Sequence, residues 1–107
     1  MNFKTDVVES GFFKLDYSSR KFFISDTLVE LRNKEFAMMM YFLLNPGRVL
    51  TRTEILECVW DRNICCPTNT VDVHISVLRN KLKKHLGYDP IRTIYCVGYV
   101  FEIKQNY

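Results

Sequence analysis

The sequence lacks any apolar segment long enough to cross a membrane. Its longest apolar run, FAMMMYFLL at 36–44, has nine residues, whereas a membrane-spanning helix needs about 20. The first ten residues, MNFKTDVVES, contain no apolar stretch of the kind that a secretion signal carries. We therefore expect a soluble protein of the cytoplasm that does not associate with a membrane.

Residue spacings typical of metal sites and enzymes are also missing. The cysteines at 58, 65, 66 and 96 form no CxxC or zinc-knuckle pattern, and there is no glycine loop that could cradle a phosphate. A metal cluster of Cys58, Cys65, Cys66 and His74 is conceivable, but buried or incidental reduced thiols are more typical of a cytosolic protein. We expect no enzyme activity, no cofactor and no bound metal.

What the chain does contain is enough apolar material for one core. Hydrophobic residues make up 48% of the 107 residues, which suits a single small domain over 1–107. The net charge is only +3, but it is unevenly distributed. Residues 1–66 hold nine Lys/Arg and nine Asp/Glu, whereas 67–107 hold six and three. The whole basic excess therefore belongs to the last third of the chain.

Patterns of apolar and turn residues predict a sheet and then a helix in the first half. Short β-type runs at 7–10, 12–16, 21–24 and 27–31 are separated by turn residues, which predicts an antiparallel sheet of four strands. A helical pattern follows at 33–44. It is apolar on two sides, which favours a helix packed between layers over an exposed Met-rich binding surface.

The second half predicts two further helices and a hairpin. The capping box TRTE at 51–54 begins a short helix that ends near Trp60. Thr68 or Asn69 is expected to cap a long helix that ends at Gly87. Strands at 91–95 and 98–103 then form a β-hairpin. This order predicts an α+β fold, a winged helix-turn-helix with an N-terminal four-stranded antiparallel sheet, three helices and a C-terminal β-hairpin wing.

The long helix carries two valines where a solvated helix gains nothing from them. At 100° per residue, Val71, Ile75, Leu78 and Leu82 form a core stripe, and Val73 and Val77 lie on the opposite side among polar residues. An apolar side chain in the DNA major groove can recognise the C5-methyl group of thymine. Packing beneath the wing or the preceding loop is the alternative role for this pair.

Four blocks of the sequence resemble one known family. They are LRNKEF at 31–36, NPGRVLTRTEILECVW at 45–60, NTVDVHISVLRNKL at 69–82 and IRTIYCVGYVF at 91–101. In this order and spacing they are similar to the C-terminal DNA-binding domain of OmpR/PhoB-type response regulators. The resemblance implies sequence-specific binding to double-stranded DNA for transcriptional regulation in a two-component system, with the third helix in the major groove and the wing at the minor groove.

The resemblance also implies roles for individual residues. Positions that usually face base edges are occupied by Asp72, Val73 and Val77. Positions that contact the sugar–phosphate backbone or lie beside it are occupied by Trp60, Asn69, Thr70, His74, Ser76, Arg79, Lys81 and Tyr99. The wing residues are Arg92, Thr93 and Tyr95. By contrast, Lys83 is expected to belong to a solvated helix face.

Several positions depart from the family pattern. Ser76 and Val77 stand where a pair of basic residues is frequent, and Tyr95 and Cys96 replace the Arg-Gly of many wings. Arg32 stands where a capping threonine is common, so Asn33 is the expected cap. These departures predict weaker binding to a single site, or a greater dependence on dimerisation.

The resemblance further implies protein partners. The loop 61–67, with its apolar ICC centre, is a candidate contact for RNA polymerase, and a loop that collapses onto the domain is the alternative. A homodimer on direct repeats is expected. Ser76, Val77 and Tyr95 replace basic residues that are frequent in the family. This leaves a second function open, in which the winged helix docks RNA polymerase or another regulator rather than DNA. Since 107 residues are filled by the effector domain, we expect no receiver domain within them.

Overall fold

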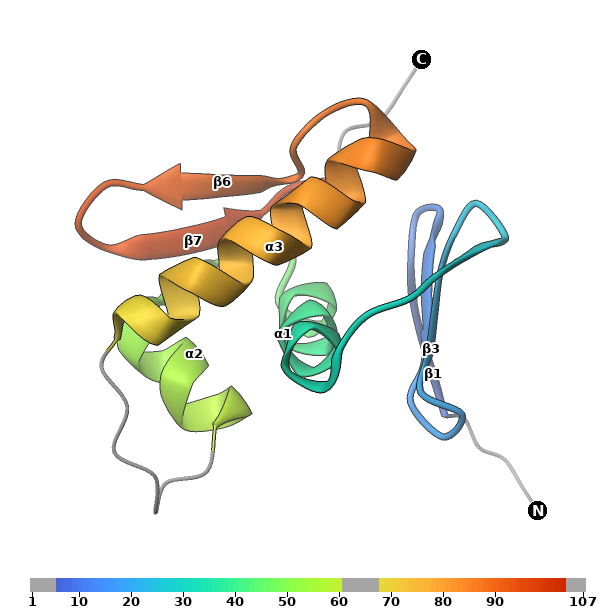
Figure 1. Ribbon diagram of the computed structural model, residues 1–107, viewed down its shortest axis with the longest axis horizontal. Coiled ribbons are helices and arrows are strands. Elements are labelled where there is room, and N and C mark those ends of the chain that lie inside the picture. The colour runs from blue at the N-terminus through green and yellow to red at the C-terminus, as the bar shows by residue number, and fades with distance from the viewer. Residues whose placement is uncertain (1–5, 61–67, 104–107) are drawn as a thin grey trace.

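The computed structural model describes residues 6–60 and 68–103 (Figure 1). Within these ranges, no helix is long and apolar enough to span a membrane. The elements follow the predicted order, with one additional strand. They are β1 (Val7–Ser10), β2 (Phe13–Asp16), β3 (Lys21–Ile24), β4 (Thr27–Val29), α1 (Asn33–Leu44), β5 (Val49–Thr51), α2 (Arg52–Val59), α3 (Asn69–Leu86), β6 (Ile91–Ile94) and β7 (Gly98–Phe101).

The N-terminal strands form the expected four-stranded antiparallel sheet in the order β1-β2-β3-β4. Alternation of side chains decides which face of this sheet is buried. Phe13 and Leu15 of β2 are buried, whereas Lys14 between them is exposed. Phe22 and Ile24 of β3 are buried on the same face. The sheet thus covers the core with one face, as predicted. Its last strand is shorter than expected and ends at Val29.

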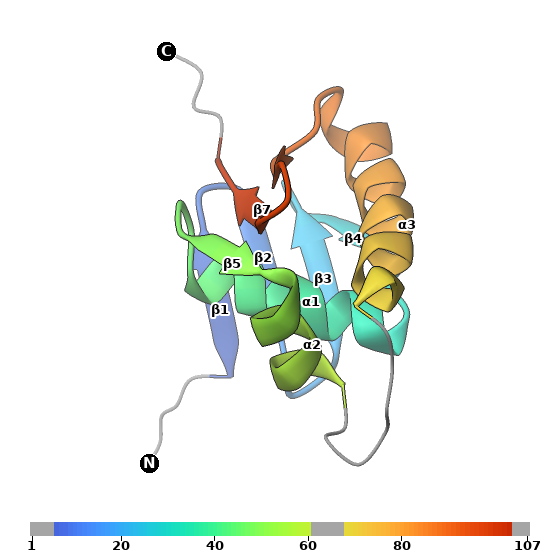
Figure 2. The ribbon, with the colours of Figure 1, turned by 90° about the vertical axis from the view of Figure 1, so that its left-hand side faces the viewer.

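Helix α1 lies between the N-terminal sheet and the layer that contains α2 and β5 (Figure 2). Met38 and Met39, on different sides of the helix, are both fully buried, and Phe42 is 1% exposed. The prediction of a helix packed between two layers is therefore correct. The alternative of an exposed methionine-rich surface is wrong.

The start of α1 differs from the sequence-based expectation. Arg32 is the N-cap, and its backbone N–H donates to the Glu35 carboxylate over 2.9 Å. Asn33 is already the first helical residue, and its side-chain oxygen accepts from Arg20 instead of capping the helix. An arginine side chain has no hydrogen-bond acceptor. The third residue of the helix, Glu35, therefore provides the capping contact that the sequence assigned to Asn33.

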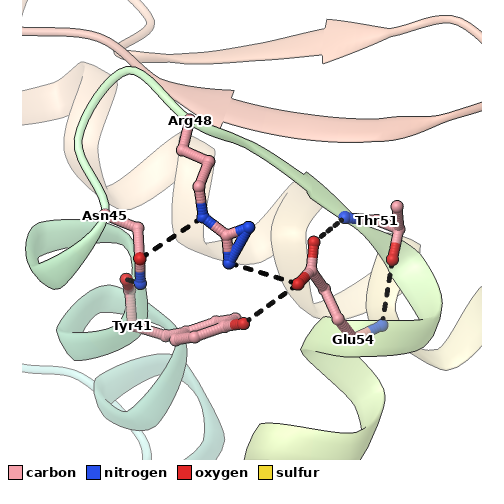
Figure 3. A network of polar contacts seen from close by, with 5 residues as sticks. All are labelled: Tyr41, Asn45, Arg48, Thr51 and Glu54. Carbon is pink, nitrogen blue, oxygen red and sulfur yellow. Dashed lines mark hydrogen bonds and ion pairs between the residues drawn. The ribbon is translucent and has the colours of Figure 1, made fainter.

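A polar network joins α1, β5 and α2 (Figure 3). In the predicted capping box, the Glu54 amide donates to Thr51 Oγ1 over 3.1 Å, and the Thr51 amide donates to Glu54 Oε1 over 2.8 Å. The other carboxylate oxygen of Glu54 accepts from the Tyr41 hydroxyl over 3.3 Å and from Arg48 over 3.2 Å. Asn45 accepts from Arg48 and donates to the Tyr41 carbonyl. The start of α2 is thereby held against the C-terminal end of α1.

The wing belongs to a three-stranded sheet in the order β5-β7-β6. The sequence predicted only the hairpin of β6 and β7 and not the third strand, β5. Strand β5 pairs with β7 so that Leu50 lies opposite Tyr99. A Cβ atom at Gly98 would lie 2.0 Å from the Leu50 carbonyl oxygen, so only glycine allows this close approach. The two predicted wing strands also end earlier than expected, at Ile94 and Phe101.

The long helix α3 has the predicted core stripe and the predicted C-terminal end. Its residues Val71, Ile75, Leu78 and Leu82 are at most 1% exposed. Gly87 has φ +79° and donates its N–H to the Lys83 carbonyl over 2.9 Å. At the other end, Thr68 occupies the N-cap position with helical backbone angles, and its side chain caps none of the described helix residues. The predicted N-cap residue Thr68 is thus confirmed by position, but it caps α3 without the expected side-chain hydrogen bond.

Candidate nucleic-acid interface

Over residues 69–80, helix α3 presents one uncharged face to solvent between two charged flanks. Val73 is 61% exposed and Val77 is 41% exposed, and neither lies beneath the wing. Asn69, Ser76 and Asn80 are exposed on the same side of the helix. This mixture of amide, hydroxyl and apolar side chains suits the edges of base pairs, which display hydrogen-bonding groups and the methyl group of thymine. The exposed valines are thus placed where a function in recognition is feasible.

On the wing side of α3, Asp72 is bonded to two other elements. Its Oδ1 accepts from Arg52 Nε at the start of α2 over 3.0 Å, and from the Tyr99 hydroxyl of β7 over 2.5 Å. Tyr99 is only 6% exposed. Burial, and then the hydrogen bond to Asp72, raise the pKa of the Tyr99 phenol. Asp72 therefore joins α2, α3 and the wing at one point.

Arg79 fastens the middle of α3 to the wing strands. Its Nε donates to the Ile91 carbonyl over 3.1 Å and lies 3.3 Å from an Asp89 oxygen. Its terminal nitrogen donates to the Thr93 hydroxyl. The guanidinium also stacks over the Tyr99 ring, 5.2 Å from its centroid. Arg79 is thus engaged within the protein, and a phosphate would have to share or replace its partners.

The wing carries an exposed charged pair at the open end of its hairpin and a bare aromatic ring at its turn. Arg92 donates to both oxygens of Glu102, over 3.1 and 3.0 Å, and this contact lowers the pKa of the Glu102 carboxyl. Tyr95 is 88% exposed. Cys96 has φ +63°, a left-handed conformation that favours glycine. The backbone therefore explains why glycine would suit the position that Cys96 occupies.

On the opposite flank of α3, His74 and Trp60 pack together. The His74 Nδ1 atom is 2.9 Å from the Thr70 carbonyl, and the imidazole meets the Trp60 indole edge-on at 5.0 Å. Lys34 from α1 lies 5.7 Å from the centre of the same indole and donates to the Val59 carbonyl over 3.1 Å. Nε2 of His74 is the ring nitrogen that remains available to a ligand on this flank.

Lys81 is also engaged on this flank. Its ammonium lies 2.6 Å from Glu35, which is 2% exposed. A hollow runs alongside this pair, between the start of α1 and the outward face of α3. It is lined by Arg32, Asn33, Lys34, Glu35, Val73, His74, Val77 and Lys81. The family resemblance implied a place for Lys81 next to DNA, but its bond to a buried carboxylate does not follow from the sequence.

Three cationic residues near the interface were missed by the sequence analysis. Arg52 follows the capping threonine of α2, and Arg32 and Lys34 flank the first residue of α1. Their helices were predicted, but helical periodicity does not tell which helix end packs beside α3. The basic side chains at predicted helix starts were the available signal.

Two sequence-based hypotheses concern residues on or next to the loop before α3. The proposed polymerase contact at 61–67, with Cys65 and Cys66, lies outside the described residues. Cys58 and Cys96 are free and exposed, so of the expected buried or incidental thiols they are of the incidental kind. In the described ranges, no group of three or more His, Cys, Asp and Glu residues is arranged to hold a metal ion.

Comparison with known proteins places the molecule in a family. The family model described as "Transcriptional regulatory protein, C terminal" matches residues 26–101. The chain belongs to this family. It is 37% identical over 101 residues to the transcriptional regulatory protein CusR of Escherichia coli, and 34% identical over 100 residues to the phosphate regulon regulatory protein PhoB of Klebsiella pneumoniae. It is thus an effector domain of the OmpR/PhoB type, as the resemblance implied.

The alignments cover most of this chain but less than half of these relatives. They include 91% of the chain and 44% of CusR, and 92% of the chain and 43% of PhoB. Residues 1–107 therefore correspond to one part of longer regulators.

Solved structures support the winged-helix fold. The DNA-binding domain of the response regulator AdeR, crystallised with an intercistronic region, has a TM-score of 0.82 at 23% identity, with 88% of this chain and 97% of that chain covered. The DNA-binding domain of Klebsiella pneumoniae RstA, crystallised with the RstA box, has a TM-score of 0.72 at 25% identity, with 90% and 96% covered. The predicted fold class is confirmed.

Proposed function

We propose that this effector domain binds double-stranded DNA in a sequence-specific manner and thereby regulates transcription. Helix α3 enters the major groove, and the β6–β7 wing lies at the adjacent minor groove. The observation that carries the proposal is the face of α3 that is uncharged and exposed over residues 69–80, between two flanks rich in cations. A helix with this arrangement can approach base edges while both of its sides face phosphates.

In this proposal, the outward face of α3 reads the bases. Val73 and Val77 cover thymine methyl groups. Asp72 accepts a hydrogen bond from a cytosine or adenine amino group. Its contacts to Arg52 and Tyr99 both use Oδ1, so Oδ2 can accept from a base without breaking them.

The residues proposed for the backbone lie on both sides of that face, apart from Asn69 and Ser76, which lie on the face itself. His74 reaches a phosphate through Nε2, and Trp60 does so through its indole N–H. Arg79 and Lys81 exchange or share their internal partners when DNA is bound. Asn69, Thr70, Ser76 and Tyr99 complete the proposed backbone contacts, and Arg92, Thr93 and Tyr95 form the wing contact.

The domain is further proposed to bind direct repeats as two copies and to contact RNA polymerase through the loop 61–67. The family resemblance supports the first proposal, because half-sites one helical turn apart suit tandem winged helices. The apolar centre of the loop supports the second. Crosslinking of the DNA complex, and binding to purified polymerase with and without the loop sequence, test these two proposals separately.

Selection of bound duplexes from a randomised pool, followed by a salt titration, tests DNA recognition itself. The expected result is a repeat containing thymine with a spacing of about 10–11 base pairs and a steep decrease in affinity with salt. A pool without enrichment, and binding that is lost near physiological salt, would instead favour the function of docking a protein partner.

Val77→Ala tests the proposed thymine contact on the selected site. Removing two methyl groups from an apolar contact is expected to weaken binding about fivefold and to relax the preference at one thymine. Val49→Ala is the matched control, because Val49 is 39% exposed on β5 rather than on α3. An unchanged base preference in the Val77→Ala variant would refute the contact.

A further inference from the structure

The start of α1 carries two cationic side chains that no carboxylate in residues 6–60 and 68–103 neutralises. Arg32 is exposed, and among the described residues no carboxylate forms an ion pair with its guanidinium. The Lys34 ammonium contacts the Val59 carbonyl and the Trp60 ring, which are uncharged. Lys81 nearby is paired with Glu35. This flank therefore holds three cations and a single described acid.

These cations border the face of α3 that is proposed to read DNA. Arg32 and Lys34 line the same hollow as Val73 and Val77. Figure 1 shows the first turn of α1 next to the middle of α3, with the strand β4 leading into it. The positive end of the α1 dipole lies at this turn and favours an anion. The start of α1, and not the wing, therefore borders the outward valines on this side of α3.

We propose that Arg32 and Lys34 contact phosphates of the DNA strand that borders the major groove on the α1 side of α3. This inference rests on the proposed function and extends it to residues outside α3 and the wing. Ser76 and Val77 provide no positive charge on α3, and Arg32 supplies such a charge from the neighbouring helix. The interface thus combines an uncharged reading face with a cationic border at the start of α1.

The salt dependence of binding to the selected duplex tests the proposal. Each phosphate contact adds about 0.9 to the slope of log affinity against log salt. Arg32→Ala is expected to lower the slope by about that amount and to weaken binding roughly fivefold to tenfold at 0.1 M salt, without a change in base preference. Arg32→Lys is expected to restore the slope, because it keeps the charge. Adding Lys34→Ala to Arg32→Ala is expected to lower the slope by about 1.8 in total.

Lys14→Ala is the matched control for charge loss, because Lys14 is exposed on the outer side of the N-terminal sheet. It should leave both slope and affinity unchanged. If the affinity of the wild-type protein falls steeply with salt and Arg32→Ala has the same salt slope, the α1 contact is wrong and the proposed function stands. If the wild-type protein itself selects no duplex, both proposals fail. Because the Arg32 side chain is exposed, thermal unfolding should be the same for Arg32→Ala and wild type.

Discussion

The two flanks of α3 differ in how their positive charges are balanced. On the wing flank, three arginines each face a carboxylate, in the pairs Arg52–Asp72, Arg79–Asp89 and Arg92–Glu102. On the α1 flank, Arg32, Lys34 and Lys81 share one described acid, Glu35. The arginines of the wing flank are thus held in internal ion pairs, and the α1 flank has an excess of positive charge.

This difference shows why counting basic residues along the sequence misplaces the electrostatic surface. The last third of the chain holds the formal excess, yet Arg79, Lys81 and Arg92 within it are paired inside the molecule. Charges that face a fixed partner act first as structural links, because a phosphate must compete with that partner. Among the described residues, the exposed Lys83 and Lys84 of α3 form no ion pair with a carboxylate. The same holds for Arg32 and Lys34 at the start of α1, in the half of the chain whose formal charges cancel.

The strongest disruption of the wing flank is expected from Gly98→Ala. The added Cβ would overlap the Leu50 carbonyl at 2.0 Å, so β5 and β7 must separate. We expect the free energy of unfolding to fall by about 3 kcal/mol. Gly87→Ala is the control. Nothing lies within 4 Å of its Cβ position and φ is +79°, so only about 1 kcal/mol of left-handed strain is expected. Equal losses in urea unfolding would contradict the steric argument.

Breaking the ion pair of the α1 flank is expected to have the next largest effect. Lys81→Met leaves the buried Glu35 with the Arg32 backbone N–H as its remaining described partner. The expected loss in the free energy of unfolding is about 2 kcal/mol, discounted because Lys81 is partly exposed. Lys83→Met, on the exposed side of α3, should change stability by less than about 0.5 kcal/mol. Adding Glu35→Gln to Lys81→Met should recover part of the loss, and a purely additive result would exclude direct coupling.

On the wing flank, Tyr99→Phe removes the hydroxyl that donates to Asp72. A loss of about 1 kcal/mol at neutral pH is expected. The folded protein raises the pKa of Tyr99, so it binds the phenolic proton more strongly than the unfolded chain does. Wild-type stability should therefore decline as the pH rises above about 10 and through the raised pKa.

Tyr99→Phe should make that alkaline decline shallower without abolishing it. A hydrogen bond with Cys58, and then burial, also raise the pKa of Tyr41, so a second tyrosine contributes. Tyr95→Phe should leave the decline unchanged, because Tyr95 is 88% exposed. Identical pH profiles of urea unfolding for wild type and Tyr99→Phe would contradict this account.

The smallest effect is expected from releasing Arg92. Glu102→Gln removes the carboxylate that holds both guanidinium nitrogens and leaves one more free cation on the wing. Affinity for the selected duplex should rise about twofold at low salt. Glu9→Gln, exposed on β1, removes the same charge far from the wing and should have no effect. If both variants behave alike, net charge rather than Arg92 accounts for any gain.

The sequence alone determined those structural elements that depend on residues close to one another in the chain. Periodicity is enough to give α1 from Asn33 to Leu44 and the buried stripe of α3, because side chains on one helix face recur every three or four residues. The left-handed Gly87 and the Thr51 capping box are equally local. The exposure of Val73 and Val77 also follows from the angle per residue alone. Recognition of the family likewise needed only four blocks in order.

Only the tertiary structure decided what joins distant parts of the chain. Strand β5 has three residues, too few for alternation to reveal, and it becomes a strand because β7 lies beside it. Lys81 forms an ion pair with Glu35, which lies 46 positions away in the sequence. Asp72 accepts a hydrogen bond from Tyr99, 27 positions away. The sequence specifies which residues are charged. Whether a given charge is neutralised depends on which carboxylate the fold brings within a few ångströms, because ion-pair energy falls with distance and solvent exposure.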